Sequence, residues 1–246
     1  MAVRFFSRLP SGTRPHQPPS LARIAPVLGF TGILIGVFPA LVLVGSSYLG
    51  LPPLLAAVFA IGLQVIITGA MAEDALADSA DGLWGGATIA RRLEIMKDSR
   101  QGTYGVLAIV LLIAARLAIL SFLVVHSPLG AGFLWLGAQI IARQGALWLP
   151  SALSPARPDG LAQKAGILPR RTFWLSSAIS ALVAMVLAVP FAGFAGTGLA
   201  TGIAALIIWG WTGICRSRVG GFSGDLIGAL QAMVEIGVLS TFILFI

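Results

Sequence analysis

Cysteine is almost absent from this sequence: Cys215 is the only one among 246 residues. A single cysteine excludes an intramolecular disulfide framework and a zinc site built from cysteines. Charged residues are scarce as well, at 10% of the chain, whereas 57% of the residues are hydrophobic and the mean hydropathy is +0.95. A chain so poor in charge and so rich in apolar side chains is expected to be a polytopic membrane protein.

Acidic residues are rarer than basic ones, because nine Asp and Glu stand against sixteen Lys and Arg. The formal net charge of +7 does not indicate nucleic-acid binding, since the basic residues lie between apolar runs and not on one patch. No internal repeat is visible. We therefore expect a single integral-membrane domain over residues 1–246, in contact with the lipid bilayer and with no nucleic acid.

Long apolar runs, each close to the roughly 20 residues that a bilayer requires, predict an all-α bundle of about seven transmembrane helices. The predicted spans are residues 27–49, 54–72, 105–125, 129–149, 173–190, 194–212 and 226–246.

Lys and Arg are absent from alternate connections. The connections without them are those near residues 50–53, 126–128 and 191–193. Basic connections stay in the cytoplasm, so we expect a multi-pass protein of the cell inner membrane whose N-terminus and residues 73–104 are cytoplasmic and whose C-terminus lies outside. Residues 1–26 are basic and proline-rich, and we expect them to lie on the cytoplasmic membrane surface with Phe5 and Phe6 inserted.

Residues 73–104 hold six of the nine acidic residues. Read as a helix at about 100° per residue, Asp74, Asp78 and Asp81 fall on a stripe roughly 60° wide. Like charges on one stripe repel each other unless a cation lies among them, and hard oxygen ligands suit Mg²⁺, which commonly brings a phosphate with it. We expect Mg²⁺ at this stripe; the alternative interpretation is a solvated acidic loop.

The segment that follows the stripe carries charges of both signs. Glu94 and Asp98 are four residues apart and share one face if the segment is helical. Arg91, Lys97 and Arg100 lie around them. Basic groups for phosphates beside acids for a metal are the composition of a phosphoryl-transfer site. The alternative is an amphipathic surface helix stabilised by ion pairs.

A glycine-rich turn, GGFSGD, precedes the last apolar run at Gly220–Asp225. Successive backbone amides before a helix can bind an anion, which makes Ser223, Gly224 and Asp225 candidate phosphate ligands. Asp225 is expected to cap the last helix. Without a ligand, the same pattern describes a tight turn with an Asp cap.

Three charged residues, Arg116, Arg143 and Glu235, lie inside predicted spans. Charges at membrane depth are costly and usually face the bundle interior, so Arg116 and Glu235 are expected to face inward, where a purely structural Glu–Arg pair is one interpretation. Arg143 is near enough to a span end for its side chain to reach the surface. A secondary transporter would use such charges, but it tends to place them on broken helices of repeated halves.

Four motifs resemble the cobalamin synthase family, the adenosylcobinamide-GDP ribazoletransferases, and they cover essentially the whole chain in order. They are FFSRLP (Phe5–Pro10), AEDALADSADG (Ala72–Gly82), LEIMKDSRQGTYG (Leu93–Gly105) and GGFSGDLIGA (Gly220–Ala229). The third is long and specific. This sequence departs from the family pattern where Ala72 replaces a His, Ala75 a Gly, Lys97 an Arg and Ala232 a Glu.

The resemblance implies that α-ribazole or its 5′-phosphate attacks the cobinamide-linked phosphate of adenosylcobinamide-GDP and that GMP leaves, with Mg²⁺ required. The corrinoid nucleotide and the α-ribazole would be the substrates of the last steps of vitamin B12 nucleotide-loop assembly. Asp98, Asp81 and Glu94 are then candidate catalytic carboxylates, with Asp98 as the candidate base for the attacking hydroxyl.

Two readings remain beside this one. A catalytically lapsed homologue would bind the substrates without turnover, and a secondary transporter would use the intramembrane charges instead. The sequence leaves open whether the chain forms a homo-oligomer or a complex with other enzymes of the cobalamin pathway.

Overall fold

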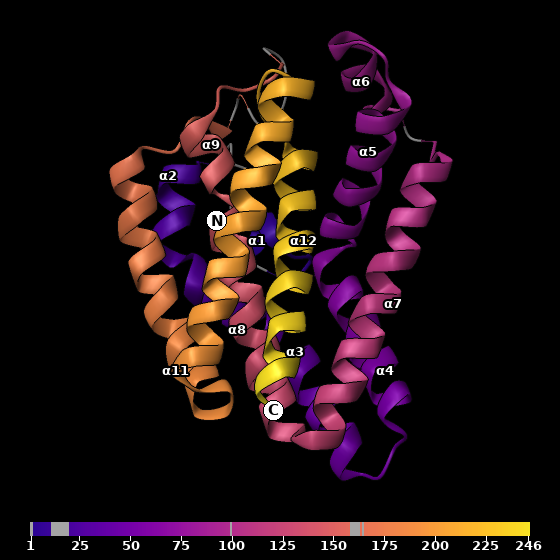
Figure 1. Cartoon of the computed structure of the whole chain (residues 1–246), viewed down its shortest axis with the longest axis vertical. Helices are drawn as coiled ribbons and strands as arrows, with labels where there is room; N and C mark the ends of the chain where they lie inside the picture. The colour runs from indigo at the N-terminus through magenta and orange to yellow at the C-terminus, as the bar shows by residue number, and fades with distance from the viewer. Residues whose placement is uncertain (1, 11–19, 99, 158–162, 164) are drawn as a thin grey trace.

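The computed structural model describes residues 2–10, 20–98, 100–157, 163 and 165–246, and Figure 1 shows their arrangement. Over these residues the regular elements are helices, apart from one isolated β-bridge between Pro155 and Phe222. The helices in chain order are α1 (Ala2–Phe6), α2 (Leu21–Ile24), η1 (Ala25–Val27), α3 (Leu28–Tyr48), α4 (Pro53–Thr68), α5 (Met71–Gly85), α6 (Ile89–Ile95), α7 (Thr103–His126), α8 (Pro128–Ala146), α9 (Trp148–Ala152), α11 (Arg170–Arg218), α12 (Gly224–Phe242) and η2 (Ile243–Phe245).

The expected all-α fold is confirmed for the described residues. Four helical stretches are long and apolar enough to cross a membrane: Leu21–Tyr48, Thr103–His126, Arg170–Arg218 and Gly224–Phe245. A fifth is added if α4 and α5, which are bent by 83° at a short break, form one broken span. The long apolar helices indicate a membrane protein, while seven crossings remain a prediction.

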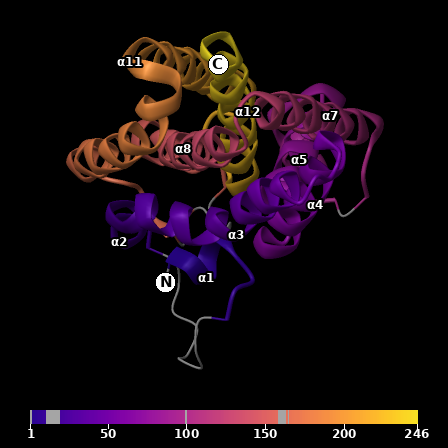
Figure 2. The same ribbon diagram turned by 90° about the horizontal axis from the view of Figure 1, so that it is seen from below.

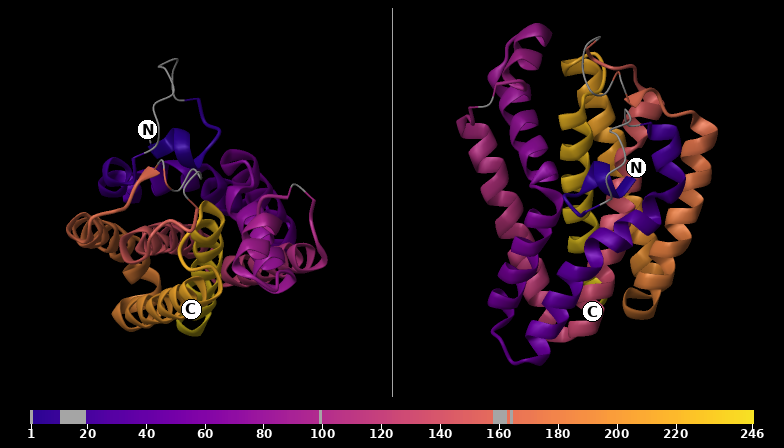
Figure 3. Two further views of the ribbon diagram at one scale, coloured as in Figure 1. Left: turned by 90° about the horizontal axis from the view of Figure 1, so that it is seen from above. Right: turned by 180° about the vertical axis from the view of Figure 1, so that it is seen from behind.

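Helix α11 covers two predicted spans, because it is a pair of arms joined at Gly193. The backbone of Gly193 has φ 67° and ψ 176°, a conformation that side chains with a Cβ essentially do not adopt. The chain reverses there, and the two arms lie side by side (Figures 1 and 3). The predicted boundary between residues 190 and 194 therefore corresponds to a glycine turn.

Helix α8 lies at the centre of the bundle, where it packs against α3, α11 and α12 (Figure 2). Most of its residues are buried, and Trp135 is fully enclosed. Glycines allow the close approach of α3: a Cβ added at Gly36 would collide with Leu136, and one at Gly132 would collide with Val44. Because α8 is shielded by its neighbours, it tolerates polar side chains such as Gln139 and Gln144.

The break between α4 and α5 sets the direction of the acidic helix. Gly69 and Ala70 both adopt left-handed backbone angles, with φ of 68° and 58°, and α5 starts directly after them. A left-handed alanine is uncommon and is held here by its surroundings. The Ala70 carbonyl accepts a hydrogen bond from the Asp74 amide at 2.9 Å, so the turn is continuous with the first turn of α5.

The N-terminal segment packs against this break instead of lying free on a surface. The Arg8 amide donates to the Ile67 carbonyl at 2.7 Å, and Phe6 is 8% exposed in a core cluster with Leu147. The expectation that Phe5 and Phe6 insert into the membrane surface is therefore wrong for Phe6, because its apolar ring is buried in the core of the protein. In the same predicted surface segment Leu21, Ile24 and Ala25 are buried in this core as well, and residues 11–19 lie outside the described residues.

The turn at Gly193 predicts a large difference between two glycines of the same helix. Gly193→Ala is expected to destabilise the fold by about 1–3 kcal/mol, because alanine does not fit these backbone angles. Gly198→Ala is the matched control: its added Cβ meets no atom within 4 Å, and helix propensity favours alanine. Thermal unfolding of both variants in detergent measures the difference, and equal melting temperatures would contradict the assigned turn.

Candidate functional site

Helix α5 presents the three stripe carboxylates at one end of the bundle, together with α6 and the beginnings of α7 and α12 (Figure 1). We call this the acidic end. The predicted helix over the stripe is confirmed, because Met71–Gly85 is helical. The three carboxylates differ in environment: Asp74 is exposed, Asp78 is partly buried and Asp81 is 7% exposed.

Asp81 binds the start of α7. Its Oδ2 accepts a hydrogen bond from the Gly102 amide at 2.7 Å, and its Oδ1 accepts one from the Gly105 amide at 2.9 Å. A Cβ at either glycine would collide with this carboxylate. A negative group at a helix N-terminus satisfies free amides and the positive end of the helix dipole. Asp81 therefore fixes α7 relative to α5, a role that the stripe pattern alone did not indicate.

Asp78 interacts with the other acids of this end. Asp74, Asp81 and Asp225 all act electrostatically on it, and Gln101 Nε2 lies 3.5 Å from its Oδ1. Asp225 comes from α12, a long way along the chain. α12 approaches α5 closely because Gly228 faces Ala75, where a Cβ would collide. The structure thus brings Asp225 from the glycine-rich turn to the stripe, forming a cluster from two helices.

The acid cluster consists of Asp74, Asp78 and Asp225, and it is defined by these three residues from here on. Within the described residues no three His, Cys, Asp or Glu side chains are already close enough to form a metal site. The three are nevertheless oxygen donors in mutual electrostatic repulsion, the donor set that a hard divalent cation would relieve. The chemistry of the donors fits Mg²⁺.

The predicted shared helical face of Glu94 and Asp98 is wrong. α6 ends at Ile95, and the Lys97 and Asp98 amides donate to the carbonyls of Glu94 and Ile95 in a tightened final turn. Glu94 is exposed and pairs with Arg91, with Nη1 and Oε2 2.8 Å apart. This short helix has no buried residue, so the surface-helix interpretation describes it well.

Asp98 pairs with Arg100 beyond the end of α6. Its carboxylate accepts hydrogen bonds from the Arg100 backbone amide, Nε and Nη2, the last at 2.7 Å. The hydrogen bonds from the Arg100 side chain and backbone lower the pKa of Asp98 to about 2. A carboxylate held so strongly in its ionised form is a weak proton acceptor at neutral pH. Lys97, one residue before Asp98, is exposed.

The glycine-rich turn caps α12 through a different residue from the one predicted. Ser223 is the N-cap: its Oγ accepts a hydrogen bond from the Leu226 amide and donates to Asp225 Oδ2, both at 3.3 Å. Asp225 lies inside the first turn. The hydroxyl is the better-placed oxygen for the free amide, which leaves the Asp225 carboxylate directed to the acid cluster.

Arg157 is a basic residue of this end that sequence reasoning missed. It acts electrostatically on Asp225, and its Nη2 donates to the Leu93 carbonyl. The backbone around it is tied to the glycine-rich turn, because the Ala156 amide donates to the Phe222 carbonyl at 2.9 Å. Arg157 lies in no motif, and its position depends entirely on this pairing of two distant loops.

Below the acid cluster, Arg116 joins two buried carboxylates. Its Nη1 pairs with Glu73 Oε1, and its Nη2 lies 2.6 Å from Glu235 Oε2. Trp135 Nε1 donates to the other oxygen of Glu235 at 2.9 Å. The inward orientation predicted for Arg116 and Glu235 is confirmed, since each is 2% exposed. The Glu73 partner was not anticipated. One cation thus connects α5, α7 and α12.

Arg143 is buried as well, at 2% exposure, so its predicted reach to the surface is wrong. Its Nη1 donates to Gln139 Oε1 at 2.9 Å, and Gln64 Nε2 donates to the same oxygen at 3.0 Å. Glu73, Glu235 and Arg116 act on it electrostatically. Two buried arginines and two buried glutamates therefore balance in charge, which lowers the cost of placing them at this depth.

A cavity of about 250 Å³ connects these groups. Its lining includes both buried arginines and carboxylates from α5 and α12: Glu73, Asp74, Arg116, Arg143, Asp225 and Glu235. Among the described residues, no hydrogen-bond partner reaches Glu73 Oε2, Arg116 Nε or Gln64 Oε1, which are buried there. Buried polar atoms around a cavity of this size are normally satisfied by water or a ligand group. The cavity is therefore a chamber with buried charged groups in its walls, and it reaches from Asp74 and Asp225 into the bundle.

The two largest departures from the motifs meet in space. Ala72 and Ala232 form a small buried cluster with Leu112, where α5, α12 and α7 converge. The two alanines leave an apolar contact next to the chamber.

The Arg116 network predicts that removing one of its charges destabilises the fold more than removing all of them. Arg116→Met leaves two buried carboxylates without their ion-pair partner and is expected to cost about 3–5 kcal/mol. The quadruple variant Glu73→Gln, Arg116→Met, Arg143→Met, Glu235→Gln removes all four buried charges and is expected to recover part of that loss.

Thermal unfolding in detergent checks this, with Arg91→Met as the control. That variant breaks an exposed pair and is expected to change stability by less than about 1 kcal/mol. If Arg116→Met were as stable as the control, the network would not contribute to the stability of the fold.

Comparison with known proteins shows the family of this chain. The family model described as cobalamin-5-phosphate synthase matches residues 1–243. A protein of Azorhizobium caulinodans named adenosylcobinamide-GDP ribazoletransferase is 40% identical over 242 residues, which is 97% of this chain and 92% of that protein. Similarly named proteins of Rhizobium johnstonii and Bradyrhizobium diazoefficiens are 38% and 39% identical, covering 97% of this chain and 93% and 90% of theirs. No solved structure matches. The chain belongs to the cobalamin-5-phosphate synthase family.

Proposed function

We propose that this chain is a membrane phosphotransferase that joins adenosylcobinamide-GDP to α-ribazole or α-ribazole 5′-phosphate and releases GMP. The match over residues 1–243 and the names of the relatives support this transfer as the final assembly of the cobalamin nucleotide loop. The observation that carries the proposal is the acid cluster, made by α5 and α12 together at the mouth of a chamber that contains two buried arginines.

The acid cluster would hold Mg²⁺, with Asp74, Asp78 and Asp225 as its protein ligands. When bound, the cation neutralises charge on the diphosphate oxygens of the nucleotide substrate. Asp81 was predicted as a ligand, but both of its oxygens already accept amide hydrogen bonds, so we assign it to positioning α7 against the cluster. Glu73 lies one residue before Asp74, and its pairing with Arg116 holds that turn of α5 in place.

Basic groups around the acid cluster would bind the phosphates of the GMP leaving group. Arg157 acts on Asp225 from the neighbouring loop, and the amides at the start of α12 behind Ser223 and Gly224 face the same end. Arg91, Lys97 and Arg100 lie on the exposed segment that follows α5. Since Arg91 and Arg100 are engaged with Glu94 and Asp98, they would need to exchange these partners for phosphate.

The proton of the attacking hydroxyl needs a carboxylate in contact with the substrates. Asp98 does not meet this requirement well, because its ion pair with Arg100 keeps its pKa at about 2 and places it outside the chamber. Asp98 and Glu94 would then orient the basic residues beside them.

Release of GMP measures the proposed activity directly. Adenosylcobinamide-GDP, α-ribazole 5′-phosphate and the purified chain are combined over a Mg²⁺ series. Asp74→Asn, Asp78→Asn and Asp225→Asn are each expected to raise the half-saturating Mg²⁺ concentration at least about tenfold, since one charged ligand is lost. Glu94→Gln removes an acid of the same segment that is exposed and paired outside the cluster, and its Mg²⁺ requirement should not change.

Three results would change the assignment. Normal turnover of the acid-cluster variants at low Mg²⁺ would show that the acid cluster is not the metal site. A large fall in turnover for Asp98→Asn, with the Mg²⁺ requirement unchanged, would restore Asp98 as the base. Binding of both substrates without GMP release by the unaltered chain would identify a lapsed homologue.

We also propose seven membrane crossings in the cell inner membrane, with the N-terminus and the acidic end in the cytoplasm. The alternating absence of Lys and Arg from the connections supports this orientation. In a Cys215→Ser background, His126→Cys and Ile167→Cys place single thiols at two exposed positions. Membrane-impermeant maleimide should label them from opposite sides of intact vesicles, and labelling of both from one side would overturn the topology.

A further inference from the structure

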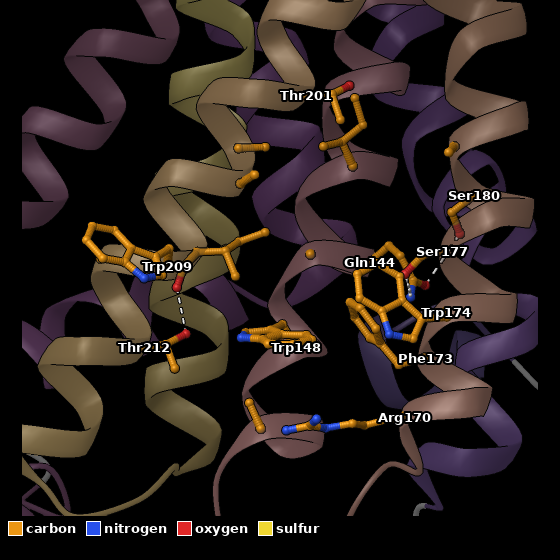
Figure 4. Close-up of a pocket in the computed structure, with 18 of the residues that line it drawn as sticks. Gln144, Trp148, Arg170, Phe173, Trp174, Ser177, Ser180, Thr201, Trp209 and Thr212 are labelled. Atoms are coloured by element: carbon orange, nitrogen blue, oxygen red, sulfur yellow. Dashed lines mark hydrogen bonds between the residues drawn. The ribbon is translucent and has the colours of Figure 1, made fainter.

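A second cavity, of about 1040 Å³, lies apart from the chamber (Figure 4). Its walls are the two arms of α11 and the facing sides of α8 and α9. Figure 4 shows Arg170 at one end and Thr201 at the other, with the rings of Trp148, Phe173 and Trp174 between them. None of the family motifs contributes to this cavity, so the proposed reaction does not account for it.

Helix α8 separates the two cavities. Arg143 lines the chamber, whereas its neighbour Gln144 lines the second cavity, and the same alternation holds for Leu147 and Trp148. Successive residues of a helix point to different sides, so α8 is a wall and not a passage. A molecule in the second cavity is therefore on the opposite side of α8 from the acid cluster.

Away from its two arginines, the second cavity offers few free polar groups. Gln144 Nε2 donates to the hydroxyls of Ser176 and Ser177 at 2.9 and 3.0 Å. The hydroxyls of Thr201 and Thr212 donate to carbonyls of their own helix at 2.9 and 2.6 Å. The other lining residues there are mainly alanine, isoleucine and methionine. Such walls suit hydrocarbon and do not suit a ligand with many amide groups.

The end of this cavity nearest the acidic end is basic. Arg170 begins α11 and Arg216 lies in its last turn, and both line the cavity with exposed side chains. Trp174 and Trp209 lie on its rim, 62% and 78% exposed. Exposed tryptophans with arginines at helix ends are typical of the level of lipid headgroups. Basic pockets between membrane helices bind anionic headgroups.

We propose that this cavity is a binding site for an anionic phospholipid, with the phosphate between Arg170 and Arg216 and an acyl chain between the arms of α11. The arginines supply charge complementarity at one end, and the apolar walls supply a hydrocarbon environment below it. The proposal is independent of the transfer reaction, because it concerns the opposite side of α8.

Native mass spectrometry of the delipidated full chain in detergent tests this site with phosphatidylglycerol as the probe. Arg170→Gln with Arg216→Gln is expected to weaken binding on the order of tenfold or more, at roughly 1 kcal/mol for each basic residue. Arg171→Gln with Arg218→Gln is the matched control, because these exposed arginines are one and two residues away and do not line the cavity. The control should retain binding.

The acyl chain is tested separately by filling the cavity. Ala205→Trp places a large ring in the lined space and is expected to lower phosphatidylglycerol binding to a similar degree. Leu206→Trp, on the next residue and outside the lining, should not. Phosphatidylcholine should bind more weakly than phosphatidylglycerol, and millimolar inorganic phosphate should not displace the lipid. Circular dichroism confirms that each variant remains helical.

Three outcomes would overturn the proposal. If both pairs of arginine substitutions weakened phosphatidylglycerol binding equally, the effect would come from general surface charge and not from this cavity. Unchanged binding in Ala205→Trp would place the lipid elsewhere. Displacement of phosphatidylglycerol by adenosylcobinamide would make this cavity a corrinoid site. None of these readings uses turnover, so failure here leaves the proposed reaction untouched.

Discussion

Neutralisation of buried carboxylates is the constraint on which the rest of this structure depends. Glu73 and Glu235 lie deep among apolar helices, where an unpaired charge would be prohibitive. Arg116 of α7 pairs with both, and Trp135 of α8 donates to Glu235. Four helices are therefore fixed around one guanidinium. Since Glu73 immediately precedes Asp74, the same pair that stabilises the bundle also sets the position of the acidic helix α5.

The acid cluster is assembled by packing and not by a single helix. The left-handed residues Gly69 and Ala70 turn α5 away from α4, and Gly228 lets α12 approach until Asp225 acts on Asp78. Asp81 then ties α7 to the same place through two amides. Carboxylates that repel one another are held together by the surrounding helices. The proposed cation would relieve this repulsion.

Helix α8 divides the molecule into two environments. On one side lies the chamber with the buried charges of Arg116 and Arg143, where the substrates' phosphates would meet the acid cluster. On the other lies an apolar cavity with aromatic walls and arginines at its end. Water-soluble substrates do not by themselves require a membrane enzyme. A lipid bound between the arms of α11 would instead make the membrane contribute to the folded structure. The lipid would pack against one face of α8, and the opposite face of α8 would line the proposed reaction site.

The sequence by itself determined the features that arise from local pattern. Apolar runs gave the helices, the spacing of Asp74 and Asp78 gave their common face, and the motif around Leu93–Gly105 gave the family. Tertiary structure decided the rest, because it depends on residues far apart in the chain. Asp225 joins the cluster only through the contact of α12 with α5, Arg157 only through the pairing of two loops, and Glu73 is buried only because Arg116 lies opposite. Asp98 does not lie on the predicted helical face, because α6 ends at Ile95. The chain then turns, and the start of α7 is capped by Asp81.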